Sequence, residues 1–246
     1  MHVFTDLVAG FDPEEPHFRP TEIFNEGWLL KAVLHQASQL ALPGSPFAFA
    51  EAATWFAEAL LPTAFTARYQ GDPLAEARTN ADGVIGHILV GTAAKADLVL
   101  KPDATQFAVV EAKIGSPLSS GTTRAPGFDQ AARNVACIAE VLRRSPLSPD
   151  RVEQLAFIVV APQKAVEAGA FASEMVPGSM RRKIEERVAS YKGEKDDWFY
   201  NWATPTLEAV NLHTVSWESA IEAISRERPG EGAALDEFYQ ECLRFN

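Results

Sequence analysis

KADLVLKPDATQFAVVEAK, from Lys95 to Lys113, is the stretch around which the chain is best interpreted. Two runs rich in Val, Leu and Phe flank the turn-like segment KPDAT, and this pattern predicts a β-hairpin. A pairing that is symmetric about Ala104 would place Asp97 opposite Glu111. Because side chains alternate between the faces of a strand, Glu111 and Lys113 would share one face.

The two carboxylates of such a hairpin need a partner. Acids directly opposite each other in a ladder have Cβ atoms about 5 Å apart and repel. A divalent cation between Asp97 and Glu111, with the ammonium of Lys113 beside it, would offset that repulsion, and oxygen ligands completed by water suit Mg²⁺. The alternative is a surface hairpin in which the acids only form salt bridges with Lys95, Lys101 or Lys113.

An Asp on one strand, Glu-x-Lys on the next and a following helix that carries Gln resemble the PD-(D/E)xK nuclease superfamily, which includes many restriction endonucleases. Asp97 matches the Asp of that motif, Glu111 its second acid and Lys113 its Lys, while Ala96 stands where the motif's name has Pro. The resemblance covers roughly residues 22 to 144. It implies an α/β domain with a restriction-endonuclease-like core, in which helices flank a mixed central β-sheet.

The resemblance also implies a metal site and a reaction. Asp97, Glu111 and the carbonyl of Ala112 would hold Mg²⁺ or Mn²⁺. Lys113 would orient the attacking water or help to deprotonate it, and would offset the charge that develops on phosphorus.

A first helix is expected from about Glu22 to Ser38, with Thr21 as its N-cap. Glu26 lies on the same face of this helix as several apolar residues, where a carboxylate needs a partner. In the resembled superfamily a Glu of the first helix often points at the metal. Glu26 matches that place and Glu22 is the competitor; the alternative is that Glu26 reaches solvent.

A second helix that bears on the site is expected from about Asp129 to Arg144. Gln130 matches a Gln that lies near the catalytic Lys in several such nucleases, although it is also a plain polar residue at a helix start. The preceding loop, IGSPLSSGTTRAPGF, is dense in Gly, Ser, Thr and Pro and carries Arg124. Arg124 and Arg133 are the predicted substrate contacts, and an exposed loop Arg is the alternative for Arg124.

The remaining elements follow from periodicity and turn signals. They are a helix over Pro46–Leu61, a strand at TAFTARY, a loop at GDPLAEARTNADG, a strand at GVIGHILVG, a buried strand over Leu155–Pro162 with a parallel neighbour, a helix around Ser179–Tyr191, a strand at NLHTVS that enters a helix capped near Ser216, and a short helix over Ala233–Phe245.

Composition favours a globular, cytoplasmic protein. The chain has 246 residues, of which 47% are hydrophobic, and two cysteines far apart, so no disulfide framework is expected. The start of the chain lacks a signal-peptide pattern, and no apolar run is long enough to cross a membrane. We therefore expect one nuclease-like domain over residues 1–246, with residues 1–20 as an extended arm.

The net charge of −11 argues against a protein that coats nucleic acid nonspecifically. The charge is segregated, however, with six bases and three acids between Arg181 and Lys195, so a basic face remains possible. No G-x-S-x-G, GKS/GKT, CxxC or HExxH sequence occurs.

The predicted function is metal-dependent hydrolysis of phosphodiester bonds in nucleic acid, with DNA the expected substrate. The alternative is a catalytically inactive protein of the same fold that binds nucleic acid or another protein as a subunit. The aromatic segment DWFYNWATP leaves a homodimer open.

Overall fold

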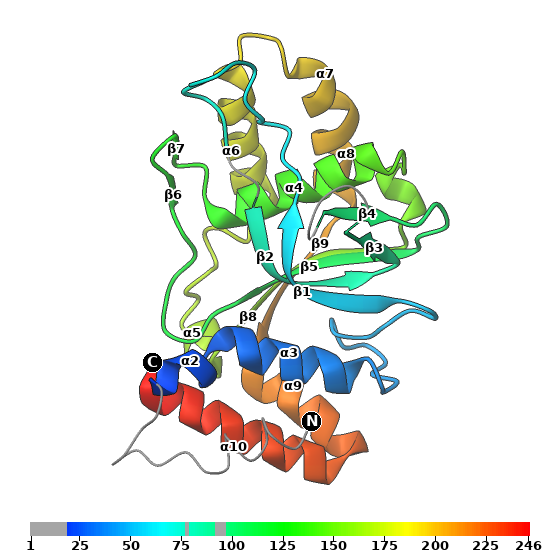
Figure 1. The fold of residues 1–246 in the computed structure, drawn as a ribbon, viewed down its shortest axis with the longest axis vertical. Coiled ribbons are helices and arrows are strands. Elements are labelled where there is room, and N and C mark those ends of the chain that lie inside the picture. Colours follow the sequence, from blue (N-terminus) through cyan, green and yellow to red (C-terminus); the bar gives the residue numbers. More distant parts are fainter. Residues whose placement is uncertain (1–18, 77–78, 92–96) are drawn as a thin grey trace.

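The computed structural model describes residues 19–76, 79–91 and 97–246. Its centre is a five-stranded sheet with the strand order β1-β2-β5-β8-β9 (Figure 1). The pairs β1–β2 and β2–β5 are antiparallel, whereas β5–β8 and β8–β9 are parallel. The expected α/β class with a mixed central sheet flanked by helices is thus confirmed. The finer expectation of a restriction-endonuclease-like core stays a prediction.

The strands of the central sheet differ in how deeply they are buried. Every residue of β5 is buried, and β8 is buried over its second half, as expected for interior strands covered on both faces. The central strands are β1 (Thr54–Leu61), β2 (Thr79–Gly86), β5 (Gln106–Ala112), β8 (Gln154–Ala161) and β9 (Asn211–Ser216). Two small sheets pair β3 (Ile88–Val90) with β4 (Leu98–Leu100), and β6 (Gly121–Thr122) with β7 (Ala125–Pro126).

Helices cover both faces of the sheet (Figure 1). One face carries α4 (Gln130–Arg144), α6 (Pro177–Ala189), α7 (Asp196–Trp198), the π-helical turn η2 (Phe199–Ala203) and α8 (Thr204–Ala209). The other face carries α2 (Pro20–Ile23), α3 (Glu26–Ala37), α9 (Trp217–Glu227) and α10 (Pro229–Phe245). The short helices η1 (Pro149–Arg151) and α5 (Gln163–Glu167) flank β8 in the sequence.

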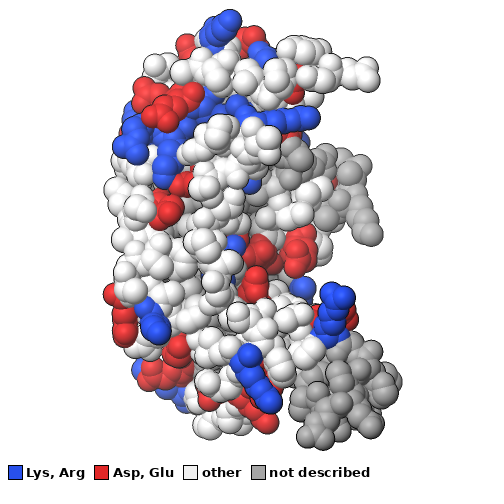
Figure 2. All heavy atoms as spheres, turned by 90° about the vertical axis from the view of Figure 1, so that its left-hand side faces the viewer, with Lys and Arg blue, Asp and Glu red and all other residues white. Residues whose placement is uncertain are grey.

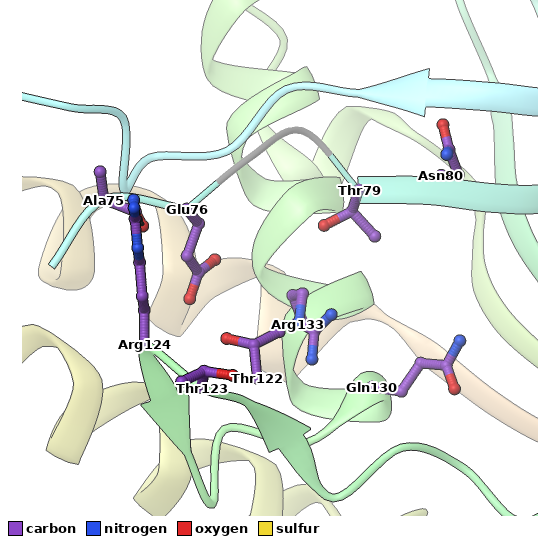
Figure 3. Close-up of a pocket in the computed structure, with 9 residues that line it drawn as sticks. All are labelled: Ala75, Glu76, Thr79, Asn80, Thr122, Thr123, Arg124, Gln130 and Arg133. Atoms are coloured by element: carbon purple, nitrogen blue, oxygen red, sulfur yellow. Dashed lines mark hydrogen bonds between the residues drawn. The ribbon is translucent and has the colours of Figure 1, made fainter. Parts of the chain in front are cut away.

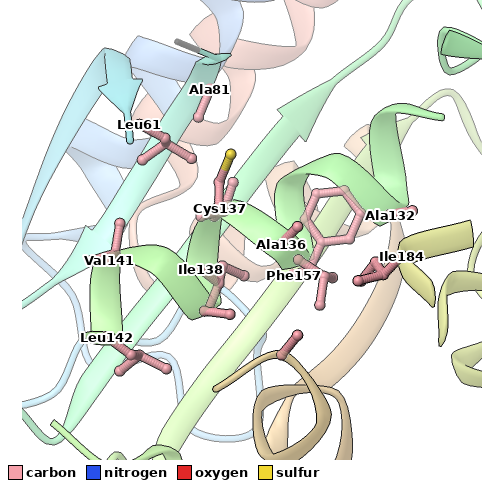
Figure 4. Packing of buried hydrophobic residues seen from close by; sticks show 14 of the residues in the cluster. Leu61, Ala81, Ala132, Ala136, Cys137, Ile138, Val141, Leu142, Phe157 and Ile184 are labelled. Carbon is pink, nitrogen blue, oxygen red and sulfur yellow. The ribbon is translucent and has the colours of Figure 1, made fainter. Parts of the chain in front are cut away.

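The sheet separates two hydrophobic clusters. On the α4 side, Cys137 and Ile138 of α4 pack in one cluster with Ala81 of β2 and Phe157 of β8 (Figure 4). Successive residues of β5 contribute to opposite clusters, with Val109 on the α4 side and its neighbours on the side of α3 and α9. Glu111 has the parity of Val109, so its side chain belongs to the face that α4 covers.

The expected hairpin symmetric about Ala104 is wrong. The strand before the KPDAT turn is β4, which pairs with β3 in a separate small sheet. The strand after the turn is β5, which pairs with β2 and β8. The apolar run of β5 has neighbours on both edges and helices on both faces, and these long-range contacts outweigh the local hairpin signal.

Four other local expectations are corrected. The segment expected as a helix over Pro46–Leu61 ends in strand β1, and TAFTARY forms no strand. The expected loop GDPLAEARTNADG runs into β2, which begins at Thr79. The first helix is split: Asn25, not Thr21, caps α3, and its side chain accepts a hydrogen bond from the amide of Trp28 at 3.0 Å.

The second half of the chain follows the expectations more closely. Asp129 caps α4 by accepting from the amide of Ala132 at 2.9 Å, and β8 runs parallel to β5. Ser216 ends β9 and caps α9. Residues 1–18 of the expected arm lie outside the described residues. Within the described ranges, no helix is both long and apolar enough to cross a bilayer.

Candidate functional site

Three acids lie at the same level on three adjacent strands. The β1–β2 pairs on either side of Glu58 set it level with Asp82. The pairing of Gly83 with Val110 sets Asp82 level with Glu111 in β5. The backbone register therefore sets the three acids in a row from β1 to β5, and Lys113 follows at the end of β5. The side chain of Glu58 contacts Lys31 of α3, which covers the face opposite α4.

Asp82 lies where β2 and β5 stop pairing through their main chains. Its Oδ2 accepts a hydrogen bond from the amide of Ala112 at 2.8 Å, so the side chain serves in place of a main-chain acceptor. The next residue, Gly83, packs closely on α3: a Cβ there would lie 3.0 Å from side-chain atoms of both Leu30 and Leu34. This contact and the Ala112 amide fix Asp82 from both sides.

Glu111 is 1% exposed and collects donors from three residues. Lys113 Nζ donates to its Oε1 at 2.7 Å, and Gln130 Nε2 donates to the same oxygen at 2.5 Å. Asn134, one turn after Gln130 on α4, donates from Nδ2 to Oε2 at 3.3 Å. Asp82 and Glu111 also share a hydrogen bond. The structure thus brings Glu111, Lys113 and Gln130 together as the sequence predicted.

The partners of Glu111 are themselves held in place. The amide of Lys113 donates to Val160 O at 2.9 Å, and Trp217 Nε1 donates to Lys113 O at 2.8 Å. Gln130 exchanges two hydrogen bonds with Ser119, whose amide lies 3.1 Å from Gln130 Oε1. The loop after β5 is therefore tied to the start of α4, and Lys113 is anchored by α9.

The electrostatics of the acid pair favour a shared proton. Burial, reinforced by the charge of Asp82, raises the pKa of Glu111 to about 8, although Lys113 opposes the shift. Burial also raises the pKa of Asp82, and the charge of Glu58 adds to that shift. A carboxyl–carboxylate hydrogen bond needs one proton, and both raised pKa values favour its retention.

This proton makes stability depend on pH. The pKa of Glu111 is higher in the folded chain than its ordinary value of 4.5. The contribution of this group to the free energy of unfolding is therefore complete below pH 4.5 and is lost as pH rises through about 8. We expect the free energy of unfolding, measured with urea in chelator, to fall between pH 5 and pH 8.5. Glu111→Gln should flatten this fall, and the exposed control Glu153→Gln should not. An equal fall in all three proteins would contradict the shared proton.

Glu58 occupies the outer end of the acid row in a strained conformation. Its φ of 54° is in the left-handed region, which non-glycine residues rarely adopt, least of all within a strand. Its Oε1 lies 3.5 Å from Lys31 Nζ in the second turn of α3, and its side chain is 59% exposed. Sequence reasoning missed Glu58, because its segment was expected to be helical.

Asp97 lies away from this row, and its predicted pairing with Glu111 is wrong. It forms an isolated parallel bridge with Leu60 of β1, on the opposite side of β1 from β2. With strands about 4.8 Å apart, three strand spacings, roughly 14 Å, separate its backbone from β5. One cation cannot be held by both Asp97 and Glu111. Asp82, 29 residues before Glu111, takes the position that the sequence assigned to Asp97.

Glu26 is half-buried in the first turn of α3, and none of the described contacts joins it to Asp82 or Glu111. Glu26 lies near the thiol of Cys242 in α10. The pKa of that thiol is raised to about 12, mainly by burial and to a smaller extent by the charge of Glu26. On α3 it is Lys31, not Glu26, that contacts the acid row.

Arg124 and Arg133 both line a cavity of about 520 Å³ (Figure 3). Arg124 reaches it from the β6–β7 turn, while Arg133 and Gln130 project from α4. Thr79 and Asn80 of β2 complete the side nearest Asp82. The two predicted substrate contacts thus share one cavity that adjoins the acid pair through Gln130.

The donor set fits a hard divalent cation bound through few side chains. Within the described ranges, no cluster of three or more His, Cys, Asp or Glu side chains is arranged to hold a metal ion. Mg²⁺, however, is commonly bound through one or two carboxylates and several waters. Asp82 and Glu111 offer such a pair, next to the backbone of Ala112, and a cation there would take the place of the shared proton.

On the face in Figure 2, Lys and Arg side chains gather over the upper part, where α6 lies in Figure 1, together with several acidic side chains. A further group of acidic side chains lies near the middle of this face.

In comparisons with known proteins, no family model matches this chain, and neither a curated protein nor a solved structure matches it.

Proposed function

We propose that the protein is a metal-dependent nuclease that hydrolyses phosphodiester bonds, with DNA as its expected substrate. The observation that carries the proposal is the meeting of Asp82, Glu111 and Lys113 where β2 and β5 separate, with both acids sharing a hydrogen bond. A buried and a half-buried carboxylate, both with raised pKa values and beside a lysine, are costly for the fold, and such arrangements concentrate at functional sites.

Asp82, Glu111 and the carbonyl of Ala112 are the groups that would hold Mg²⁺ or Mn²⁺. The ion, when bound, supplies Lewis acidity to a phosphate oxygen and lowers the pKa of a bound water. Lys113, 2.7 Å from Glu111, orients the water and offsets the negative charge that develops on the phosphate. Gln130 and Asn134 hold the Glu111 carboxylate in one orientation.

The test is a cleavage assay on single- and double-stranded DNA and RNA with Mg²⁺ or Mn²⁺. We expect cleavage of at least one substrate, abolished by chelator. Glu111→Gln keeps the shape and burial of the side chain but removes its charge, so it should lower cleavage by about 10² or more. Cleavage that survives in Glu111→Gln would identify a contaminant or another active site.

Failure of the wild type to cleave any of the four substrates would contradict the nuclease and favour a binding subunit with the same site. A nuclease and a binding subunit with this site would differ only in whether they cleave the substrate. The folding of wild type and of Glu111→Gln must therefore be monitored separately. Circular dichroism and urea unfolding of both proteins in chelator serve that purpose.

A further inference from the structure

The cavity of about 520 Å³ that Arg124 and Arg133 line opens beside the acid pair (Figure 3). Gln130 belongs to both places, because it lines the cavity and also donates to Glu111. Asn80, two residues before Asp82 on β2, lines the same side. A ligand in the cavity therefore lies next to the groups that would act on a phosphodiester.

The walls of this cavity are cationic. Arg124 is exposed and uses one nitrogen on Ala75 O at 3.4 Å, and Arg133 uses one on Phe128 O at 3.4 Å. The Nε of Arg133 is buried without a hydrogen-bond partner among the described residues. Glu76 is the one acid among the nine described lining residues.

Glu76 cancels only part of that positive charge. Its side chain is 4% exposed and is paired with Arg187 of α6 at 3.2 Å, and burial raises its pKa. Its Oε2 is buried without a hydrogen-bond partner among the described residues, and Arg133 also acts on the carboxyl group. Three guanidinium groups, those of Arg124, Arg133 and Arg187, thus surround one acid, so an anionic group is the ligand favoured by charge.

The size of the cavity requires more than a phosphate. Small-molecule sites typically measure about 300–1,000 Å³. The hydroxyls of Thr122 and Thr123 add hydrogen-bonding groups, and their methyls, with Ala75, add apolar surface. Guanidinium planes stack on bases. A ligand that joins an anion to a flat polar ring therefore matches the positive charge, the size and the hydrogen-bonding groups of the cavity. A paired base cannot enter such a cavity, because it would first have to leave its stack.

We propose that this cavity holds one unpaired nucleotide next to the scissile phosphate, with Arg124 on its phosphate and Arg133 beside it. The proposal deepens the nuclease function. It rests on that function only in stating that the neighbouring phosphate is the one that is cleaved. The protein therefore acts on single strands or unpaired ends in preference to closed duplex.

Binding without chemistry tests the cavity directly. Each of the four deoxynucleoside monophosphates is titrated calorimetrically into wild type in the presence of chelator. We expect at least one to bind saturably, and Arg124→Gln and Arg133→Gln each to weaken it about tenfold or more. Arg226→Gln, an exposed arginine on α9 paired with Glu222, serves as the matched control and should bind as wild type does. Inorganic phosphate and the unphosphorylated nucleoside should each bind at least tenfold more weakly than the nucleotide.

Three results would overturn the proposal: no saturable binding of any nucleotide, equal affinity in Arg124→Gln, or inorganic phosphate that binds as tightly as the nucleotide. The cleavage arm compares linear single strands with closed circular duplex, and equal rates would contradict the requirement for an unpaired nucleotide. A wild type that cleaves but binds no nucleotide refutes the cavity assignment alone. A wild type that binds nucleotide through Arg124 but cleaves nothing refutes the nuclease alone.

Discussion

Asp82→Asn should lower cleavage by about 10³-fold or more, whereas Asp97→Asn should leave it within a few-fold of wild type. Asp82 shares a hydrogen bond with Glu111 and accepts from the amide of Ala112, so its charge is placed where a cation would bind. Metal assistance contributes several kcal/mol, and each 1.36 kcal/mol is a factor of ten in rate. Asp97 bridges Leu60 on the far side of β1, away from this pair of acids.

The two variants form a matched pair, because each replaces an Asp by its isosteric amide, at the half-buried Asp82 and the buried Asp97. Cleavage is measured with Mn²⁺, and thermal unfolding is recorded with and without the ion. Mn²⁺ should raise the melting temperature of wild type and Asp97→Asn but not that of Asp82→Asn. Loss of cleavage in Asp97→Asn, with Asp82→Asn active and stably folded, would reverse the assignment.

Lys113→Ala should lower cleavage by about 10² or more while metal binding survives. The lysine supplies a positive charge beside Glu111 but no oxygen ligand, so its loss removes stabilisation of developing charge and leaves the cation's ligands intact. The backbone of Lys113 stays anchored through Val160 and Trp217, which limits structural change.

Lys113→Arg is the companion variant for this position. It keeps the charge but changes its geometry, because a planar guanidinium cannot replace a compact ammonium 2.7 Å from Glu111. Its activity should lie between those of wild type and Lys113→Ala. Cleavage that persists unchanged in Lys113→Ala, with Mn²⁺-dependent stabilisation retained, would show that Lys113 takes no part in the reaction.

Local signals predicted one half of the site. The parity of β5 set Glu111 and Lys113 on one face, and the polar start of α4 supplied Gln130 next to them. Asn134 follows Gln130 by one turn, and that spacing was a usable sign of a second contact to Glu111. These inferences hold because each depends on the geometry of a single element.

The other half depends on which strands pair, and that is not local. Asp82 stands in the polar run Thr79–Gly83, which has the composition of a loop, and it becomes a strand residue only through pairing with β1 and β5. Glu58 lies in WFAEALL, whose residues also suit a helix, and it reaches the row only because β1 pairs with β2. A single sequence carries no signal for these long-range pairs, so it favoured the nearer Asp97.

A crystal soaked with Mn²⁺ tests the central claim most directly, because the anomalous signal of manganese locates the ion without reference to activity. The account predicts a peak between the carboxylates of Asp82 and Glu111, within about 2.3 Å of an oxygen from each and beside the carbonyl of Ala112. A peak at Asp97, or no peak at the acid pair at an Mn²⁺ concentration that supports cleavage, would contradict it.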